Sequence, residues 1–358
     1  MFRLFLMLSL LAAGPLLAQA QPFRIGIAGL SHTHVHWLLS RAHDGDLEIV
    51  GIAEADRALA ERYLKQYNLP LSLLYPSLEE MLNRSKPEAV AAFNPISEHV
   101  DVVRQCAPRK IHVMVEKPLA ATLEQAKEME RLARQHGIHL VTNYETTWYA
   151  SNYAAKEQLK NLGLIRKMVA HHGHPGPKAI GVNEEFLVWL TDPVKNGGGA
   201  LTDFGCYGAN LFTWLMNGER PLSVTAVTQH FQPGVYPKVD DEATIIVSYA
   251  KAQGIIQASW NWPHNRKDLE VYAQQGLVVA DKQSLVVQKG NEAKVNLPLA
   301  PISKPEHDPF IYLAALVRGE VTVKPADLSA LENNMIVMEI LEAAKESAST
   351  GKTIHLPK

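Results

Sequence analysis

Apolar runs alternate with amphipathic segments through the first half of the chain. Two short apolar runs, Phe23 to Ala28 and Leu47 to Ala53, enclose a segment with helical spacing from Val35 to Ala42. The alternation continues, with strands expected at 89–93, 111–115 and 138–142 and helices at 56–67, after Ser97 and at 122–136. Repeated strand-helix units predict a parallel, doubly wound sheet of the Rossmann type.

The spacing of apolar residues changes in the second half of the chain. From Leu222 onward, apolar and polar positions alternate over short segments separated by turn residues. We expect strands at 223–231, 243–249, 254–260, 269–273, 277–280, 284–288 and 293–297, a long helix at 327–348 and a short extended tail at 353–356. The predicted fold is therefore α/β: a Rossmann-type domain, then an α+β domain with a large, mostly antiparallel open sheet.

The N-terminus differs from both halves. Residues 1–20 begin Met-Phe-Arg, continue as an apolar run and end in Ala18-Gln19-Ala20, a small-x-small cleavage pattern. The run is shorter than the ~20 residues that span a bilayer and contains Pro15, which favours a cleaved signal peptide over a membrane anchor. We expect a Rossmann-type domain at 22–145, a second domain at 146–325, and a C-terminal helix and tail at 326–358 that return to the domain boundary. The mature protein should be periplasmic or secreted, with no membrane association.

Composition excludes one class of partner. The 358 residues carry a formal net charge of −2, and lysine and arginine are scattered along the chain. Nucleic acid is therefore not an expected partner. The two cysteines, Cys106 and Cys206, are expected as free thiols, the first in a surface helix.

The turn after the first strand is where a Rossmann sheet binds a dinucleotide. It reads Gly29-Leu30-Ser31-His32-Thr33-His34, so only the first glycine of a Gly-x-Gly-x-x-Gly fingerprint is present. Ser31 can still offer its N–H and hydroxyl to phosphate, but His34 at the third glycine position must push the helix or the cofactor outward. Alone, this motif is weak.

Glu54 strengthens the case because it ends the second strand. An acid there can hold the adenosine ribose hydroxyls and repel a 2′-phosphate, which favours NAD over NADP. The alternative is that Glu54 merely opens a polar loop with Asp56 and Arg57.

Three further motifs follow in a fixed order. They are Asn94-Pro95 with His99 at the start of a helix, Val115-Glu116-Lys117-Pro118-Leu119 at the end of the strand expected at 111–115, and the run from Gly197-Gly198-Gly199 through Asp203 to Tyr207. The pattern resembles the Gfo/Idh/MocA family, named for glucose-fructose oxidoreductase and inositol dehydrogenase. The resemblance covers almost the whole mature chain.

The resemblance implies catalytic roles for Lys117, Asp203 and Tyr207. Lys117 would lie beside the nicotinamide and hydrogen-bond the substrate oxygen, with a pKa lowered by burial. Asp203 matches the family's acid, and Tyr207 stands where many members have histidine. Lys117 could favour the phenolate of Tyr207, so that the two form an acid/base pair; alternatively, Tyr207 only packs. Glu116 would orient Lys117 or a ribose, and Pro118 would fix the turn, for which a cis bond is one option.

The remaining site residues are grouped by expected role. The cofactor set comprises Gly29, Ser31, His32, His34, Glu54, Asn94, Pro95, His99, Glu116 and Lys117. The substrate set comprises Tyr144, His172, His174, Trp260 and His264. Trp260 would stack on a sugar, unless it fills the core, and the histidines could equally be ordinary core or loop residues. His32 and His36 would share a helical face, but no third ligand is required, so no metal is expected.

Three functions remain open. The first is an NAD-linked oxidoreductase that acts on a sugar or polyol. The second is a glycosidase or lyase that works through a transient keto-sugar and recycles its NAD, which export favours because free nicotinamide cofactor is scarce outside the cytoplasm. The third is a sugar-binding relative without catalysis. By resemblance, the protein should be a homodimer or homotetramer.

Overall fold

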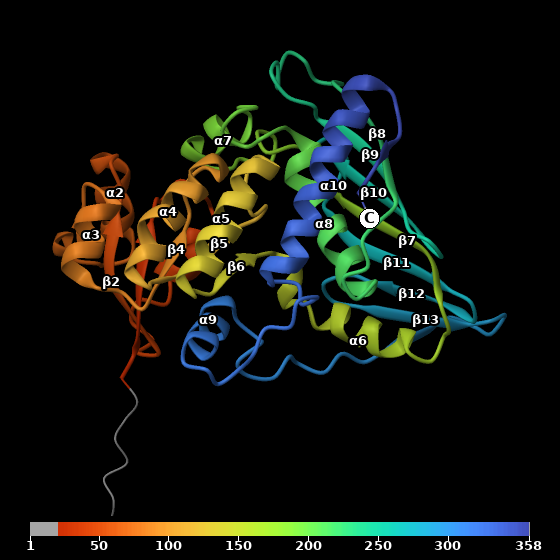
Figure 1. Cartoon of the computed structure of the whole chain (residues 1–358), viewed down its shortest axis with the longest axis horizontal. Helices are drawn as coiled ribbons and strands as arrows, with labels where there is room; N and C mark the ends of the chain where they lie inside the picture. The colour runs from red at the N-terminus through yellow and green to blue at the C-terminus, as the bar shows by residue number, and fades with distance from the viewer. Residues whose placement is uncertain (1–20, 358) are drawn as a thin grey trace, which may run out of the picture.

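The structure, a computed structural model, describes residues 21–357. The expected signal peptide at 1–20 lies outside the described residues. Two domains lie side by side, each built on its own sheet (Figure 1). Within the described part of the chain, no helix has the length and apolar character needed to cross a membrane.

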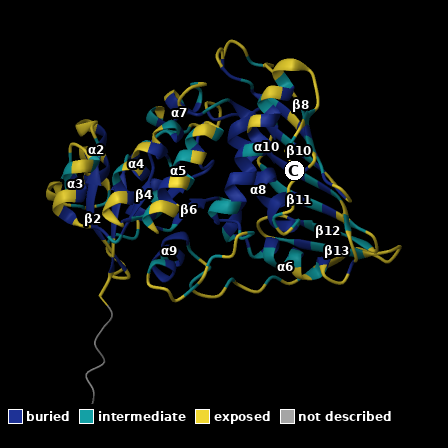
Figure 2. Cartoon of the chain, viewed as in Figure 1, coloured by how far each residue is buried: buried dark blue, intermediate teal, exposed yellow. Residues whose placement is uncertain are grey.

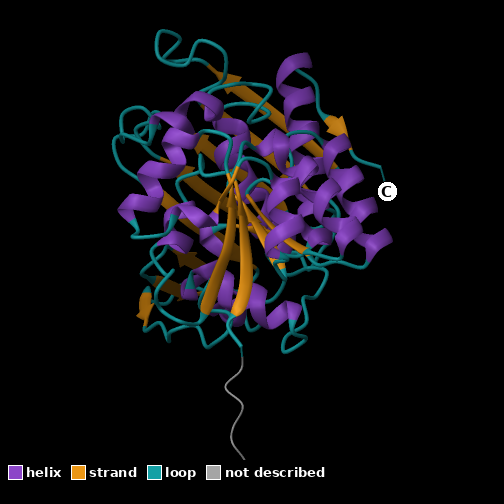
Figure 3. Ribbon diagram, turned by 90° about the vertical axis from the view of Figure 1, so that its left-hand side faces the viewer, coloured by secondary structure: helices purple, strands orange, loops and turns teal. Residues whose placement is uncertain are grey.

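The first domain contains a six-stranded parallel sheet in the order β3-β2-β1-β4-β5-β6. Its strands stand at the centre of the domain with helices on both sides (Figure 3). The predicted doubly wound sheet is confirmed, and only the short β3 was not expected. The strands are β1 (Phe23–Ala28), β2 (Leu47–Ala53), β3 (Leu74–Tyr75), β4 (Ala89–Ala92), β5 (His112–Glu116) and β6 (Leu140–Asn143).

The helices of this domain begin at capping residues. Asp56, Ser77 and Thr122 each accept a backbone N–H in the first turn of the helix that follows. Two helices are exceptions, because the helix after β1 and the helix that begins at His99 have no side-chain cap. The first of these spans five residues and ends before the expected Ala42. The helices are α1 (Val35–Leu39), α2 (Arg57–Gln66), α3 (Leu78–Ser85), α4 (His99–Cys106) and α5 (Leu123–His136), with 3-10 turns η1 (Leu71–Leu73), η2 (Ile96–Glu98) and η3 (Ala107–Arg109).

The second domain contains a nine-stranded sheet in the order β14-β13-β12-β11-β7-β10-β9-β8-β15. Only β7 and β10 pair in parallel, so the predicted mostly antiparallel sheet is confirmed. The strands are β7 (Ile165–Gly173), β8 (Ser223–Gln229), β9 (Glu242–Ser248), β10 (Gln253–Ser259), β11 (Arg266–Ala273), β12 (Gly276–Ala280), β13 (Leu285–Lys289), β14 (Val295–Leu297) and β15 (Ile354–His355).

Two long helices, α8 (Ala200–Leu215) and α10 (Leu331–Thr350), cover the inner face of this sheet. Every residue of α8 is buried, as the dark helix at the centre of Figure 2 shows. Gly208 allows the close packing, because a Cβ there would lie 2.7 Å from the side chain of Ile256. The shorter elements are η4 (Glu145–Trp148), α6 (Ala150–Leu159) and α7 (Glu184–Leu190). α8 is thereby fixed between the sheet and the first domain.

One segment departs from the expected division. Residues 146–325 were expected in the second domain, but Pro309–Val317 form α9, whose Phe310 and Leu313 are buried in the core of the first domain with residues of β1 and α1. Its uniformly apolar sequence gives no helical face by which its docking partner could be predicted. Cys106 and Cys206 are free, as expected, but Cys106 faces the core rather than the surface.

Candidate active site

Lys117 and Asp203 meet from the two domains. Lys117 follows β5 directly, at a cis Lys117–Pro118 peptide bond, and Asp203 lies in the first turn of α8. The Nζ of Lys117 donates to the Asp203 carboxylate and, at 3.2 Å, to the Asp203 backbone oxygen. Both residues are buried, with exposed fractions of 6% and 5%. The ion pair therefore joins the carboxyl end of the first sheet to the second domain.

Asp240 and Trp260 hold Asp203 in place. The Asp240 carboxylate accepts the backbone N–H groups of Gly199 at 2.9 Å and Leu201 at 2.7 Å, so it caps α8. A Cβ on Gly199 would lie 1.8 Å from the Asp240 backbone oxygen, which explains a glycine here. The indole N–H of Trp260 donates to Asp203 Oδ2 at 3.0 Å. Both oxygens of the Asp203 carboxylate are thus fixed.

The charges of this pair correct one expectation. Burial alone would lower the pKa of Lys117, as expected from the sequence, but the adjacent Asp203 carboxylate outweighs burial and raises it. Burial would likewise raise the pKa of Asp203, yet Lys117 holds it below its ordinary value. Lys117 is therefore an ammonium at neutral pH, and it acts as a hydrogen-bond donor.

Tyr207 lies one turn further along α8 and is enclosed by polar and aromatic groups. The Nζ of Lys117 is 5.2 Å from the centroid of its ring, and the ring of His172 stacks on it at 5.3 Å. The ring of Tyr144 packs edge-on at 5.4 Å. Burial, followed by the charge of Glu145, raises the pKa of Tyr207 well above its ordinary value. The expected promotion of phenolate by Lys117 is therefore wrong for this arrangement, and the phenol stays protonated.

Lys267 and Glu145 belong to this site but were not predicted. Lys267 lies opposite His172 in the register of β11 and β7, and its Nζ is 5.0 Å from the centroid of the Tyr207 ring. Glu145 accepts hydrogen bonds from Lys267 and, at 2.6 Å, from the Tyr149 hydroxyl. Burial alone would raise the pKa of Glu145, but Lys267 lowers it to about 2. The pairing of β7 with β11 brings Lys267 here, and no local sequence signal predicts that pairing.

Three residues of the expected substrate wall lie on this side of α8: His172 and Tyr144 contact the ring of Tyr207, and His174 contacts Phe204. His172 is fully buried, neither ring nitrogen has a partner among the described residues, and burial lowers its pKa to about 3. His174 packs edge-on against Phe204, and its Nδ1 accepts the N–H of Gly176 at 2.9 Å. Buried polar atoms usually have a hydrogen-bond partner, so the two ring nitrogens of His172 are exceptions in this region.

Trp260 and His264 do not join this wall. Trp260 is 0% exposed and packs against Tyr236, so it cannot offer a face to a sugar. The core-filling alternative describes it correctly, with the added role of holding Asp203. His264 is exposed in the turn between β10 and β11, and no contact within residues 21–357 joins it to Lys117. Both were assigned from a Trp-Asn-Trp-Pro-His pattern that does not show which side chains turn inward.

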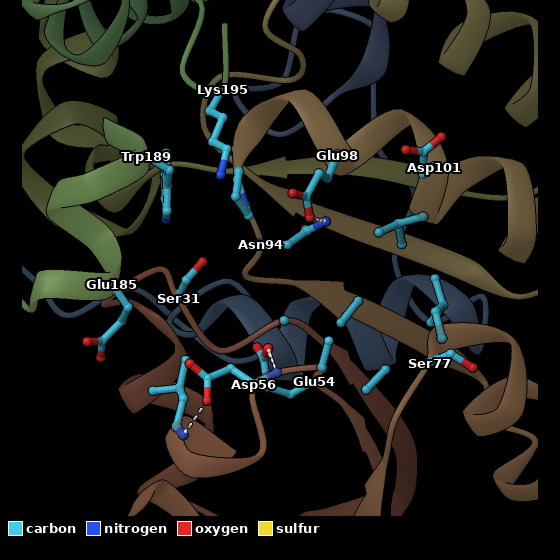
Figure 4. A pocket seen from close by; sticks show the side chains of 18 of the residues that line it. Ser31, Glu54, Asp56, Ser77, Asn94, Glu98, Asp101, Glu185, Trp189 and Lys195 are labelled. Atoms are coloured by element: carbon cyan, nitrogen blue, oxygen red, sulfur yellow. Dashed lines mark hydrogen bonds between the residues drawn. The ribbon is translucent and has the colours of Figure 1, made fainter. Parts of the chain in front are cut away.

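A cavity of about 510 Å³ opens at the carboxyl ends of β1, β2 and β4. Five residues of the expected cofactor set line it: Gly29, Ser31, Glu54, Asn94 and Pro95. Glu185, Trp189 and Lys195, which were not predicted, enter it from α7 and the segment that follows (Figure 4). The second domain therefore supplies part of its wall.

Glu54 and Gly29 shape the floor of this cavity. The Glu54 carboxylate accepts the N–H groups of Leu30 at 2.9 Å and Asp56 at 2.9 Å. Gly29 has a φ of +77°, and a Cβ there would lie 2.6 Å from the Cβ of Asn94. The first glycine of the turn is thus required by conformation and by space. A cavity of this volume with a fixed carboxylate at the end of β2 fits the adenosine ribose of a dinucleotide.

His32, His34 and Glu116 form a hydrogen-bonded chain next to Lys117. The Nδ1 of His32 accepts the N–H of His34 at 3.1 Å, and the Nδ1 of His34 bonds Glu116 at 2.8 Å. Asn143 donates to the other Glu116 oxygen at 2.8 Å. The ring of His32 packs edge-on against Phe186 of α7. These residues are not among those that line the cavity.

His99 supports the turn after Lys117 instead of lining the cavity. Its Nδ1 donates to the Leu119 backbone oxygen at 3.1 Å, and burial lowers its pKa to about 4. It is a neutral core histidine, which was the alternative for this group of residues. Its position at the start of α4 was predicted correctly, but its side chain was expected to face the cofactor and instead faces the turn after Lys117.

The sequence suggested His32 and His36 as a possible pair of metal ligands, although no metal was expected. His32 precedes α1, so the two do not share a helical face, and His36 contacts Tyr63 and Tyr67. Nitrogen and oxygen atoms of His32, His34 and Glu116 lie within 4.8 Å of one another. The Nδ1 atoms of both histidines are engaged in the chain described above, so a metal would be bound through the Nε2 atoms or after that chain rearranges. The expectation of a site without metal stays a prediction.

Two family profiles match the chain in order. The oxidoreductase family with NAD-binding Rossmann fold matches residues 23–144, and the GFO/IDH/MocA C-terminal domain matches residues 154–279. The chain belongs to the Gfo/Idh/MocA family of oxidoreductases, and its first domain is an NAD-binding Rossmann domain. The expected family and cofactor are confirmed.

Individual relatives share about a quarter of their residues with this chain. Trans-1,2-dihydrobenzene-1,2-diol dehydrogenase of Xenopus tropicalis is 25% identical over 314 residues, which cover 84% of this chain and 89% of the relative. A dTDP-3,4-didehydro-2,6-dideoxy-alpha-D-glucose 3-reductase of Saccharopolyspora spinosa is 24% identical over 266 residues, 73% of this chain and 75% of the relative.

Solved structures share the whole fold. Aldose-aldose oxidoreductase from Caulobacter crescentus, complexed with glycerol, superposes with a TM-score of 0.80 at 21% identity. The match covers 94% of this chain and 100% of the oxidoreductase chain. An inositol dehydrogenase homolog from Azotobacter vinelandii, complexed with NAD+, superposes with a TM-score of 0.79 at 19% identity. The match covers 94% of this chain and 98% of the homolog.

Proposed function

We propose that this protein is an NAD-dependent oxidoreductase that acts on a sugar, polyol or related carbohydrate. The observation that carries the proposal is the buried Lys117–Asp203 pair, which lies beside Tyr207 at the edge of an NAD-binding sheet. The relatives named above are a diol dehydrogenase, a sugar-nucleotide reductase and an aldose oxidoreductase, and their names support a substrate with hydroxyl groups.

The residues of the site divide the work on the reacting oxygen. Bound NAD supplies the hydride chemistry, since its nicotinamide exchanges hydride with a carbinol carbon. Lys117, kept as an ammonium by Asp203, hydrogen-bonds the substrate oxygen and stabilises its developing negative charge. Tyr207, a protonated phenol, is the second donor. In the reduction direction the substrate oxygen that gains negative charge takes its proton from Tyr207 or Lys117, and in the reverse direction the hydroxyl proton returns to whichever of the two is deprotonated. His174, which is half-buried, binds another hydroxyl, whereas Tyr144 and His172 are fully buried and support the ring of Tyr207.

The cofactor is proposed to be NAD rather than NADP. Glu54 lies at the end of β2, where its carboxylate can accept hydrogen bonds from both ribose hydroxyls. A 2′-phosphate at this position would meet that negative charge in a partly closed cavity. The cavity should therefore discriminate against NADP.

A second candidate keeps the same site without net oxidation. The segment Glu184–Leu190 lies over the cavity and is tied to α2, because Glu185 pairs with Arg62 at 2.7 Å and accepts the Tyr63 hydroxyl. A covered cofactor suits a glycosidase or lyase that oxidises a sugar transiently and regenerates NAD in each cycle.

The cofactor content of the purified protein tests both candidates. Protein expressed from residue 21 is denatured, and the released nucleotide is measured by absorbance and mass spectrometry. NAD or NADH retained at one per chain supports the recycled cofactor and directs the search to glycosides. NAD that is absent but binds reversibly on addition supports the ordinary dehydrogenase. A protein that binds no NAD contradicts the proposed function and favours a sugar-binding role.

We also propose export to the periplasm or beyond, on the pattern of residues 1–20. Expression of the full chain and N-terminal sequencing of the extracytoplasmic fraction test it. A mature terminus at Gln21 supports the proposal, and an intact Met1 in the cytoplasm contradicts it.

A homo-oligomer is proposed from the outer face of the second sheet. Val227 and Tyr272 point outward there, with exposed fractions of 61% and 40%. Light scattering on the purified protein should give twice or four times the monomer mass. A monomer mass at micromolar concentration would contradict it.

A further inference from the structure

The cavity is acidic, with a single cationic side chain. Among the described residues that line it, Lys195 is the only cation. The acidic residues there are Glu54, Asp56, Glu98, Asp101 and Glu185. Arg62 pairs with Glu185 at 2.7 Å and Arg104 with Asp101 at 2.6 Å. Three carboxylates therefore remain without a basic partner in the described structure.

An NAD molecule brings two negative charges on its pyrophosphate. Rossmann domains usually meet them with a glycine-rich turn and the N-terminus of the helix that follows. Here Ser31 and His34 replace the second and third glycines, and α1 has only five residues. The local backbone thus offers less to an anion than the fold usually does. The cavity needs a positive charge from elsewhere.

Lys195 is placed to supply it. The segment that carries Lys195 is rigid, since Asp192 Oδ1 accepts the N–H of Lys195 at 3.0 Å and the Lys195 backbone oxygen accepts the N–H of Ser97 at 2.9 Å. Figure 4 shows its ammonium pointing into the space between Trp189 and Asn94. Its Nζ makes no hydrogen bond or ion pair within the part of the chain that the structure describes, and its charge acts on the Glu98 carboxylate, which also lines the cavity.

We propose that Lys195 binds the pyrophosphate of the cofactor, in place of the missing glycine-rich turn. The proposal rests on the proposed function, because it takes the dinucleotide as the occupant of the cavity. It assigns to the second domain a part of cofactor binding that Rossmann domains usually perform alone. Lysine serves here as a point charge, which suits an exposed phosphate.

Binding measured by calorimetry tests this role without catalysis. The probes are NAD+ and ADP-ribose, which share the pyrophosphate. Lys195→Gln should weaken the binding of both probes by the same factor, roughly 10- to 100-fold, which is the effect of losing one charge-assisted hydrogen bond. Lys195→Arg should restore most of the affinity. Lys289→Gln, an exposed lysine on β13, is the matched control and should bind as wild type.

Salt dependence separates a charge contact from a structural effect. Affinity of the wild type for ADP-ribose should fall between 50 and 500 mM NaCl more steeply than that of Lys195→Gln, with unchanged thermal unfolding. Equal affinity of wild type and Lys195→Gln for both probes would overturn the inference while leaving the proposed function intact. A wild-type protein that binds neither probe would overturn both.

Discussion

The indole N–H of Trp260 donates to Asp203 Oδ2 at 3.0 Å, while the other carboxylate oxygen binds Lys117. Trp260 follows β10 and is fully buried, so the sheet of the second domain fixes the acid that fixes the lysine of the first. A rotation of the Asp203 carboxylate would move the Lys117 ammonium away from the substrate oxygen that we propose it binds. The position of Lys117 therefore depends on both domains.

Trp260→Phe should lower turnover more than stability. The phenyl ring keeps most of the packing against Tyr236 but removes one hydrogen bond to a charged group, a loss of about 1.5–3 kcal/mol if expressed fully in the transition state. We expect kcat/KM to fall roughly tenfold or more, with KM little changed. Trp262→Phe, in the same turn, is the control. Equal effects of the two changes would show that the Trp260 N–H does not position Asp203.

Glu185→Gln should speed release of the cofactor. The change weakens the bonds from Glu185 to Arg62 and Tyr63, which tie α7 over the cavity. Dissociation of NADH, followed by stopped-flow fluorescence, should become roughly 3- to 10-fold faster, the effect of losing about 1 kcal/mol. Glu184→Gln changes the exposed neighbour and should leave the rate unaltered. A Glu185→Gln rate equal to wild type would show that α7 does not retain the cofactor.

Lys267→Met should destabilise the protein. It leaves the half-buried carboxylate of Glu145, whose pKa Lys267 lowers to about 2, with weaker partners, and the pKa should rise toward its ordinary value. The expected loss is about 2 kcal/mol in the free energy of unfolding at pH 7, measured with urea. Lys282→Met removes an exposed partner of the same carboxylate and should cost less than about 0.5 kcal/mol. Equal losses would contradict this account of Glu145.

Buried histidines should make the protein sensitive to mild acid. His99 has an ordinary pKa of 6.5 when unfolded and about 4 when folded, so the unfolded chain binds more protons between these values. Stability is therefore lost as the pH falls from about 6.5 to about 4, by about 3 kcal/mol for His99. Carboxylates such as Glu145 lose their contribution to the free energy of unfolding only at lower pH, near and below about 4.

His99→Asn tests this slope. The asparagine amide can donate to the Leu119 backbone oxygen, as His99 Nδ1 does, but it does not titrate in this range. Its free energy of unfolding should fall less steeply between pH 7 and 4.5 than that of wild type. His307→Gln, at an exposed loop position, should keep the wild-type slope. An unchanged slope in His99→Asn would contradict a neutral, buried His99.

The sequence predicts those features that depend on period and local motif. Both sheets, the long last helix and the positions of Gly29, Glu54 and Lys117 at strand ends follow from apolar spacing and chain order. The docking of α9 on the first domain does not follow, because its uniformly apolar sequence fits any core.

The direction of a side chain and the charges around it are harder to predict from the sequence. The expected low pKa of Lys117 counted burial but not the distance to Asp203, which only the packing of α8 fixes. Lys267 and Lys195 reach their places through strand pairing and a loop crossing between domains. Such contacts between distant segments leave no spacing signal in one sequence.

Hydride transfer at the Lys117 site is the central claim, and a single-turnover experiment tests it most directly. Protein loaded with one equivalent of NAD+ is mixed with saturating aldoses, inositols and polyols in turn, and absorbance at 340 nm is followed. At least one compound should produce NADH, lastingly or transiently, in wild type but not in Lys117→Met, which binds NAD+ equally. No signal with any compound, or the same signal in Lys117→Met, would contradict the claim.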